Sequence, residues 1–292
     1  MFRVSRAVEI RNDSVSGAKE VLAALSPESS ADEKAAPIVN HVKSIAKSVL
    51  LRLGLELRRV PGMYALRTSL STSYAFLRER GVAPRTVIDV GVADGTPELH
   101  AVFPEAFFLL IEPLTEYDHD IVRILRKYKG KHIRAAAGRE SGTVTFNIHP
   151  NHIAGSSLYK ETMGSAADGH EIEVAMVRLD DVASENNLVP PYLLKVDVQG
   201  AELDVLDGAQ NILSDCEAVV LEVSLFQFMR GQPEFCEVIA YMKEREFVPY
   251  DIHPGWNRPL DGALGQVDVI FVPENCSLRE DHSYGATEKG PY

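Results

Sequence analysis

Residues 192–202, YLLKVDVQGAE, indicate both the fold and a candidate site. An apolar run with the character of a strand ends here in ionisable residues and a glycine. A buried strand would therefore bring Lys195, Asp197 and Glu202 to one place. Parallel α/β sheets bind ligands in the crevice beyond the carboxyl ends of their strands, where the strand order reverses. The cluster is either such a site or a structural group of ion pairs, and its residues alone do not decide between the two.

The composition is that of a globular protein. The chain has 292 residues, of which 45% are hydrophobic and 25% charged, enough for one domain of roughly 200–250 residues with extensions. Its cysteines, Cys216, Cys236 and Cys276, form no C-x-x-C pair and no obvious disulfide framework, which indicates a reducing compartment. No run approaches the ~18 apolar residues of a transmembrane helix, and the amino terminus lacks a secretory signal. We therefore expect a cytoplasmic protein.

Charge is distributed unevenly along the chain. Residues 1–84 carry 13 Lys and Arg against 8 Asp and Glu, whereas residues 85–292 carry 17 against 34. The acidic larger part argues against nucleic acid as a partner, because phosphates require a basic surface. The substrate is accordingly not expected to be a polyanion.

The amino-terminal part contains an arm and a helical extension. Residues 1–37 are rich in Ser, Ala, Glu and Asp without sustained periodicity, which predicts a mobile arm. In the extension, residues 38–84, apolar residues recur every three or four positions over 38–57 with basic residues between them. This amphipathic helix packs on its own domain or on a second subunit of a homo-oligomer, or it contacts an anionic membrane surface. A second helix is expected over residues 68–80, ending at Gly81.

After the extension, strand-like and helix-like segments alternate. This order predicts a doubly wound, mainly parallel α/β sheet closed by an antiparallel pair. One helix is expected to stop at Gly130, and Pro233 is expected to open another. Two further β-like stretches, 143–149 and 171–179, flank the turn-rich residues 151–168, an insertion of a length typical of functional or disordered loops. The seven expected strands of the sheet cover residues 86–90, 107–111, 132–137, 192–196, 218–223, 247–250 and 267–272.

A glycine turn follows the first expected strand. In residues 87–97, VIDVGVADGTP, the strand runs into Gly91 and Gly95 and then into a helix with Thr96 as its N-cap. Glycines let the backbone pass close to a ligand. The spacing is not the G-x-G-x-x-G of dinucleotide enzymes, and Asp89 stands just before the first glycine. An acidic turn suits a cationic ligand better than a diphosphate.

Glu112 follows the second expected strand and lies 23 residues beyond Asp89. An acid about 20 residues after such a turn is placed to accept hydrogen bonds from the hydroxyls of a ribose. It could otherwise be a solvated acid that caps the next helix, but the glycine turn before it favours the ribose role. A ribose-binding acid, an acidic turn and no diphosphate motif together indicate S-adenosyl-L-methionine, which has a ribose and a sulfonium cation but no phosphate.

These motifs resemble the FkbM family of S-adenosylmethionine-dependent methyltransferases. The similarity spans roughly residues 85–273, in order, and the motif at 194–202 is its most specific part. Two positions depart from the family pattern, namely Ala93, where the family often has Asn, and Gln199, where it usually has Glu. The matching segments are IDVGVADG (88–95), IEP (111–113), LDD (179–181), LKVDVQGAE (194–202), LDGA (206–209), LEV (221–223) and QVDVIFV (266–272).

The resemblance implies a Rossmann-like class I methyltransferase fold over residues 85–273, followed by a tail at 274–292. It implies S-adenosyl-L-methionine as the cofactor and, as the methyl acceptor, a hydroxyl of a sugar, a glycan or another small molecule such as a secondary metabolite. The residues expected to bind the cofactor are Asp89, Gly91, Val92, Asp94, Gly95, Glu112, Ala136 and Asp197.

Methyl transfer is an in-line displacement, so the protein must mainly align the nucleophile, the methyl group and the sulfur. Asp197 is expected to accept the proton of the acceptor hydroxyl, and Lys195 to hold Asp197 or polarise the nucleophile. Glu202 is expected to brace the turn by accepting backbone N–H bonds, whereas Glu222, at the end of the fifth strand, is expected to face the acceptor. Asp197 and Glu222 supply too few oxygen ligands for a metal, and none is expected.

Two other interpretations stay open. The chain could be a nucleotide-dependent oxidoreductase on a similar sheet, although the missing phosphate motif disfavours it. It could also be a catalytically silent module that keeps the fold for assembly. Among the loop residues, His253 with Trp256 is a candidate wall for the acceptor, and His149 and His152 border the insertion; single loop histidines are usually surface residues.

Overall fold

The computed structural model describes residues 67, 69–149, 152–164 and 169–283, which belong to the unit Arg67–Tyr292. The arm expected over residues 1–37 and the basic helix expected over 38–57 lie outside the described residues, as do residues 284–292 of the expected tail. Their boundaries and roles stay predictions.

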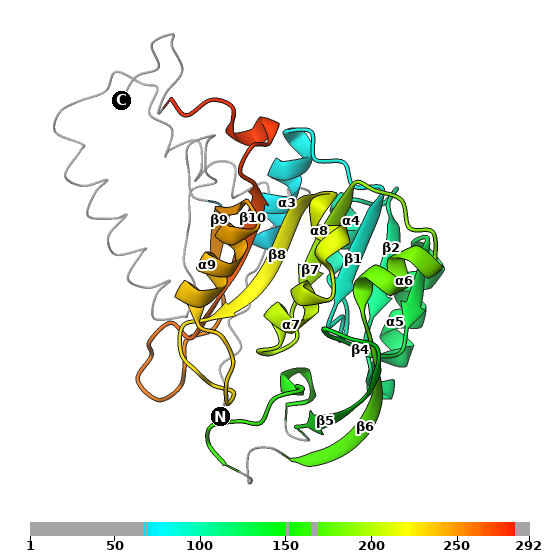
Figure 1. Ribbon diagram of the computed structural model, residues 1–292, viewed down its shortest axis with the longest axis vertical. Coiled ribbons are helices and arrows are strands. Elements are labelled where there is room, and N and C mark those ends of the chain that lie inside the picture. Colours follow the sequence, from blue (N-terminus) through cyan, green and yellow to red (C-terminus); the bar gives the residue numbers. More distant parts are fainter. Residues whose placement is uncertain (1–66, 68, 150–151, 165–168, 284–292) are drawn as a thin grey trace, which may run out of the picture. The chain divides into compact units, whose positions relative to one another are not determined.

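A seven-stranded sheet forms the centre of the described fold (Figure 1). Its strand order is β3-β2-β1-β7-β8-β10-β9, and β10 alone runs antiparallel to the rest. The order reverses between β1 and β7, which confirms the predicted doubly wound sheet with its antiparallel closing pair. The strands are β1 (Thr86–Val90), β2 (Phe107–Ile111), β3 (Gly130–Ile133), β7 (Tyr192–Val196), β8 (Cys216–Ser224), β9 (Phe247–Pro254) and β10 (Gln266–Pro273).

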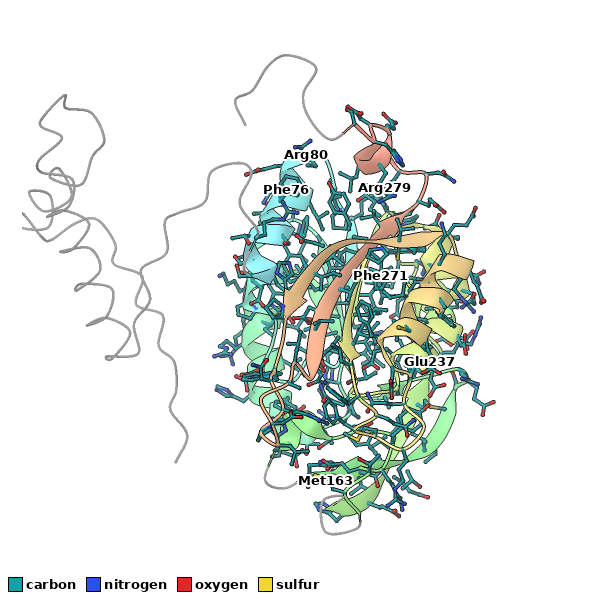
Figure 2. All side chains as sticks on the ribbon, turned by 90° about the vertical axis from the view of Figure 1, so that its left-hand side faces the viewer. Phe76, Arg80, Met163, Glu237, Phe271 and Arg279 are labelled. Carbon is teal, nitrogen blue, oxygen red and sulfur yellow. The ribbon has the colours of Figure 1, made fainter. Side chains whose placement is uncertain are left out.

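Helices cover both faces of this sheet, so the central strands are buried on both sides and read as continuous apolar runs. Val87 and Leu193 pack toward α3, α4 and α5, whereas their neighbours Ile88 and Leu194 pack toward α6 to α9. Phe271 of β10 is fully buried within this packing (Figure 2). The helices are α3 (Leu70–Glu79), α4 (Pro97–Val102), α5 (Asp118–Lys127), α6 (Leu179–Glu185), α7 (Glu202–Asp207), α8 (Gln210–Ser214) and α9 (Phe235–Glu244).

A second, three-stranded sheet lies below the large one in the view of Figure 1. It consists of β4 (Ala136–Ala137), β5 (Gly142–Ile148) and β6 (His170–Val177), with β6 in the middle. Phe146 and Ile148 of β5 form a small separate core with Ala136 and Leu114. The two β-like stretches that flank the insertion therefore pair with each other and not with the main sheet.

The third expected strand, 132–137, was wrong in its extent. The main sheet uses Gly130–Ile133, and Ala136–Ala137 belongs to the second sheet. Gly130 accordingly opens β3 and does not stop the preceding helix. A Cβ at Gly130 would lie 2.3 Å from the carbonyl oxygen of Phe108, so glycine is needed for the close approach of β3 to β2.

Two helix predictions also need correction. The single helix expected after β7 is divided into α7 and α8, because the buried carboxylate of Asp180 accepts hydrogen bonds from the backbone N–H groups of Asn211 and Ile212 and starts a new helix there. Pro233 does not open α9. The N-cap is Glu234, whose side chain forms a reciprocal capping box with Glu237.

Candidate cofactor and active site

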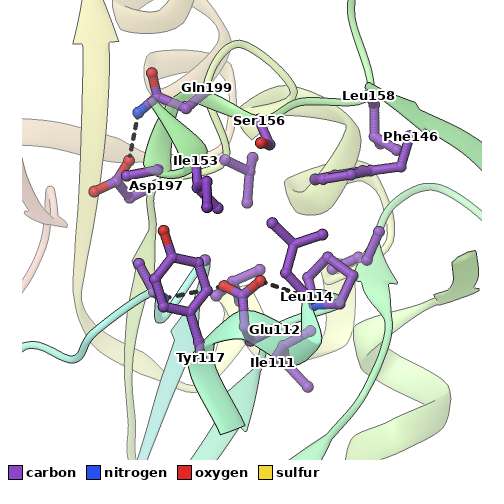
Figure 3. A pocket seen from close by; sticks show the side chains of 18 of the residues that line it. Ile111, Glu112, Leu114, Tyr117, Phe146, Ile153, Ser156, Leu158, Asp197 and Gln199 are labelled. Carbon is purple, nitrogen blue, oxygen red and sulfur yellow. Dashed lines mark hydrogen bonds between the residues drawn. The ribbon is translucent and has the colours of Figure 1, made fainter. Parts of the chain in front are cut away.

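A cavity of about 230 Å³ lies beyond the carboxyl ends of β1, β2, β7 and β8. Figure 3 shows its lower wall, with Glu112 and Tyr117, facing Asp197 and Gln199 across an open space. The second sheet and the insertion close the remaining side. The residues that line it include Val90, Gly91, Ala93, Ile111, Glu112, Leu114, Tyr117, Ala136, Phe146, His152, Ile153, Ser156, Leu158, Asp197, Val198, Gln199, Glu222, Trp256 and Gln266.

Gly91 brings the turns after β1 and β7 into direct contact. The backbone N–H of Asp197 donates to the carbonyl oxygen of Val90 at 3.0 Å. A Cβ at Gly91 would lie only 1.8 Å from the carbonyl oxygen of Asp197, and the residue has a φ of +76°. Only glycine fits both conditions. The strand order reverses at this contact, which is where a doubly wound sheet offers a crevice.

Glu112 joins the glycine turn to the cavity. Its Oε2 accepts the backbone N–H of Ala93 and its Oε1 accepts that of Leu114, both at 3.0 Å. Burial raises the pKa of this carboxyl, and the two backbone bonds partly offset the effect. Each oxygen makes one of these bonds and keeps a lone pair for a ligand. Glu112 can therefore brace the turn and accept ligand hydroxyls at the same time.

The residues expected to bind the cofactor divide into those that line the cavity and those that do not. Gly91, Glu112, Ala136 and Asp197 line the cavity, whereas Asp89, Val92, Asp94 and Gly95 do not. Val92 is a core residue, and Asp94 is exposed.

Asp89 lies behind the cavity as a support. It is completely buried, accepts a hydrogen bond from the Thr96 hydroxyl at 3.0 Å and lies 3.6 Å from Lys195 Nζ. The structure thus places Asp89 against Lys195 and outside the cavity lining. Thr96 is the N-cap residue of α4, as expected, but its hydroxyl is committed to Asp89 and makes no capping bond.

Lys195 and Asp197 lie together, as the opening motif suggests. Lys195 Nζ is 3.4 Å from Asp197 Oδ2. Burial lowers the pKa of the Lys195 ammonium, but the carboxylates of Asp197 and Asp89 more than offset this, so the pKa lies above its ordinary value. Lys195 is therefore a permanent cation that fixes Asp197, which lines the cavity on its other side.

Glu202 braces the turn, as expected. Its Oε1 accepts the backbone N–H groups of Val198 and Gly200, both at 3.1 Å. Burial raises the pKa of Glu202 to about 7 against the effect of these bonds. Glu202 does not line the cavity.

Gln199 and Gln266 are polar lining residues whose roles the sequence did not reveal. Gln199 Nε2 donates to Asp197 Oδ1 at 3.0 Å and to Glu222 Oε2 at 2.6 Å. Gln266 Nε2 donates to the same Glu222 oxygen at 2.9 Å. The insertion supports this group, because the Ser157 hydroxyl donates to the carbonyl oxygen of Gln199 at 2.7 Å. Only the pairing of β10 with β8 places Gln266 here, and a single sequence carries little signal for it.

The structure brings Trp256 to the cavity but not His253. Trp256 lines the cavity and keeps 74% of its surface exposed. His253 is buried elsewhere, with its Nε2 2.7 Å from the Ser73 hydroxyl. Of the two histidines that border the insertion, His152 lines the cavity, and His149 is buried with its Nδ1 2.9 Å from Glu161.

Among the residues that the structure describes, no group of three or more His, Cys, Asp or Glu side chains could hold a metal ion. Among the helices that the structure describes, none combines the length and the hydropathy needed to span a bilayer.

Comparison with known proteins identifies the family. The family model described as "Methyltransferase FkbM domain" matches residues 89–249, more than half of the chain. The chain belongs to the FkbM methyltransferase family. The Rossmann-like class I methyltransferase fold that the motifs led us to expect is therefore confirmed, and the cavity lies within a methyltransferase domain.

Individual relatives are distant. "Methyltransferase 1" of Beauveria bassiana (strain ARSEF 2860) is 24% identical over 193 residues, which cover 59% of this chain and 76% of the relative. An rRNA methylase from Streptococcus thermophilus is 11% identical, with 72% and 98% of the two chains covered and a TM-score of 0.38. The N-methyltransferase NodS from Bradyrhizobium japonicum WM9 is 6% identical, with 70% and 93% covered and a TM-score of 0.39.

Proposed function

We propose that this FkbM protein is an S-adenosyl-L-methionine-dependent O-methyltransferase that acts on a hydroxyl of a sugar, a glycan or another small molecule. The observation that carries the proposal is the position of Glu112, whose two oxygens each hold one backbone N–H and face the cavity that Asp197 also lines. One cavity thus joins a ribose-binding carboxylate to a carboxylate able to accept a proton.

The cavity suits S-adenosyl-L-methionine better than a dinucleotide. Glu112 would accept the ribose hydroxyls, and the backbone of Gly91 lies in the same lining. Apolar side chains from Ile111, Leu114 and Phe146 provide a wall for the adenine. Among the described residues, no Lys or Arg lines the cavity, so a diphosphate would have no cation to pair with.

The cofactor, when bound, would supply an activated methyl group, which the acceptor oxygen would take as the carbon–sulfur bond breaks and its electron pair stays on sulfur. Asp197 accepts the hydroxyl proton, and Lys195 holds the Asp197 carboxylate in place from behind. Because the sulfonium charge disappears as the bond forms, alignment of the groups matters more than stabilisation of charge.

The acceptor is proposed to be uncharged. Glu112 and Asp197 give the described lining an acidic character, which disfavours a phosphate or carboxylate on the part that enters. Trp256 adds an exposed, flat apolar face to the lining, against which a sugar ring or another flat group could pack. A cytoplasmic location stays a prediction from the unpaired cysteines.

Trp256 also provides a test, because it is the single tryptophan of the chain and lines the cavity. Its fluorescence is measured while the full chain is titrated with S-adenosylhomocysteine and, separately, with NADH. Saturable binding of S-adenosylhomocysteine at micromolar concentration is expected. Binding of NADH alone would favour the oxidoreductase interpretation and overturn the proposal. If S-adenosylhomocysteine binds but no methyl group reaches any of a panel of hydroxylated acceptors, the silent module becomes the better account.

A further inference from the structure

Gln199 divides one amide group between two carboxyl groups. The Nε2 nitrogen has two hydrogens, and both are used, toward Asp197 Oδ1 at 3.0 Å and Glu222 Oε2 at 2.6 Å. Gln266 donates to Glu222 Oε2 as well. Within the described residues, Glu222 Oε1 has no hydrogen-bond partner, and Glu222 lines the cavity.

The surroundings of the two carboxyl groups are unequal. Asp197 has the Lys195 ammonium at 3.4 Å. Across the described chain, Glu222 forms no ion pair with any Lys or Arg within 4.0 Å. Asp197 therefore has a counter-ion, and Glu222 has none.

Most groups that face Glu222 from neighbouring elements are acidic. Asp197 faces it from the end of β7 and Glu202 from α7. Asp268 of β10 lies directly opposite Glu222 in the strand register, and His253 of β9 lies opposite Asp268. Lys195 is the nearest cation and is held by Asp197 and Asp89.

The pKa values of the carboxyl groups around Glu222 reflect this lack of a cation. Burial, reinforced by the charge of Asp197, raises the pKa of Glu222 well above its ordinary value. Burial and Asp197 also raise the pKa of Asp268 to about 6. Two neighbouring carboxyl groups in a desolvated site resist double ionisation, and the one without a cation keeps its proton.

We propose that Glu222 acts as a neutral carboxylic acid that donates a hydrogen bond from Oε1 into the cavity, beside the Asp197 carboxyl group that Lys195 holds. The two amides occupy Oε2, which leaves Oε1 to carry the proton. The inference rests on the proposed function, and it narrows the substrate class. Asp197 accepts from the hydroxyl that is methylated, and Glu222 donates to an oxygen on a neighbouring atom of the same acceptor. The preferred acceptor therefore has oxygens on two neighbouring carbon atoms, as in a vicinal diol or a 2-alkoxy alcohol.

Carbon-13 NMR tests this proton directly and needs no acceptor. The full chain is labelled at the glutamate side-chain carboxyl carbon and titrated from pH 4 to pH 9, next to Glu222→Gln, which removes one resonance and keeps a neutral donor. We expect the missing resonance to titrate with a midpoint well above the ordinary value of a glutamate carboxyl. A midpoint near the ordinary value of about 4.3 would overturn the inference. If Glu222→Gln does not fold, Glu222→Met assigns the same resonance.

The result is separate from the test of the proposed function. Failure to bind S-adenosylhomocysteine would refute the cofactor assignment and leave the position of the proton measurable. A low midpoint with normal binding would refute only the role of Glu222. The resonance of Glu202, whose pKa burial raises to about 7, provides an internal comparison, because it must persist in Glu222→Gln.

Discussion

Two turns meet at the cavity, one after β1 over residues 91–96 and one after β7 over residues 197–201. Both contain left-handed backbone, at Gly91, Ala93 and Gly95 in the first turn and at Gln199 and Gly200 in the second. Each turn is held by a buried glutamate that accepts backbone N–H groups, Glu112 for the first and Glu202 for the second.

The two glutamates differ in how their oxygens are used. Glu112 spreads its two backbone bonds over both oxygens and lines the cavity, whereas Glu202 uses Oε1 for both and lies outside the lining. Both are buried to a similar extent, and burial raises the pKa of both. Burial and a raised pKa therefore do not distinguish the glutamate that lines the cavity from the one that does not. The use of the two carboxylate oxygens does.

The contact between the two turns should be the most sensitive point. In Gly91→Ala the new methyl group would meet the backbone of Asp197, and the left-handed φ would be strained as well. We expect a loss of about 3 kcal/mol or more in the free energy of unfolding, measured by urea denaturation. Gly262→Ala is a matched control, because Gly262 has nearly the same φ, +77°, but no atom within 4 Å of the added Cβ. It should lose only about 1 kcal/mol, and equal losses in the two variants would refute the close contact.

Glu202→Gln should change how stability depends on pH. The folded protein holds the Glu202 proton to about pH 7, whereas the unfolded chain releases it near pH 4.3. This contribution to stability is therefore complete below about pH 4.3 and is lost as pH rises toward 7. Glutamine keeps an oxygen for both backbone N–H groups and cannot ionise.

The free energy of unfolding is measured by urea denaturation at pH 5 and at pH 8. From the lower to the higher pH, the difference between Glu202→Gln and wild type should shift by about 1–3 kcal/mol in favour of the variant. Replacement of the exposed Glu105 by Gln controls for the loss of one negative charge. A difference between Glu202→Gln and wild type that stays constant with pH would show that Glu202 is not held as a buried acid.

A smaller effect is expected at Ala93, which has a left-handed φ of +46° in the first turn. Ala93→Gly should relieve this strain and gain about 0.5–1 kcal/mol in the free energy of unfolding. Ala83→Gly is the comparison, because Ala83 lies in an exposed loop without a positive φ, and it should lose a similar amount. A rise in melting temperature for the first variant and a fall for the second is the expected pattern.

The sequence predicts β1, β2 and β7 to the residue, because short apolar runs buried on both faces leave little choice of register. It fails where distant groups decide the local structure. Asp180 accepts backbone N–H groups more than 30 residues away and so starts α8 within the stretch that the sequence predicts as one helix. The second sheet takes Ala136–Ala137 from a run that reads as one strand.

The candidate site likewise contains residues that the sequence brings together and contacts that it does not predict. Asp197 and Glu112 directly follow β7 and β2, and Glu222 lies near the carboxyl end of β8, so a sequence pattern can bring them together. Gln266 reaches Glu222 only through the antiparallel register of β10, and Ser157 reaches Gln199 across the insertion. Neither contact has a local signature in the chain.

The most direct test of the central claim is isothermal titration of S-adenosylhomocysteine into wild type, Glu112→Ala and Glu202→Gln. If Glu112 holds the ribose and Glu202 only braces the turn, Glu112→Ala should lose about 1.5–3 kcal/mol of binding free energy, which is roughly a 10- to 150-fold weaker Kd. Glu202→Gln should bind within a few-fold of wild type. Unchanged affinity in Glu112→Ala, with the variant still folded by urea denaturation, would contradict the account.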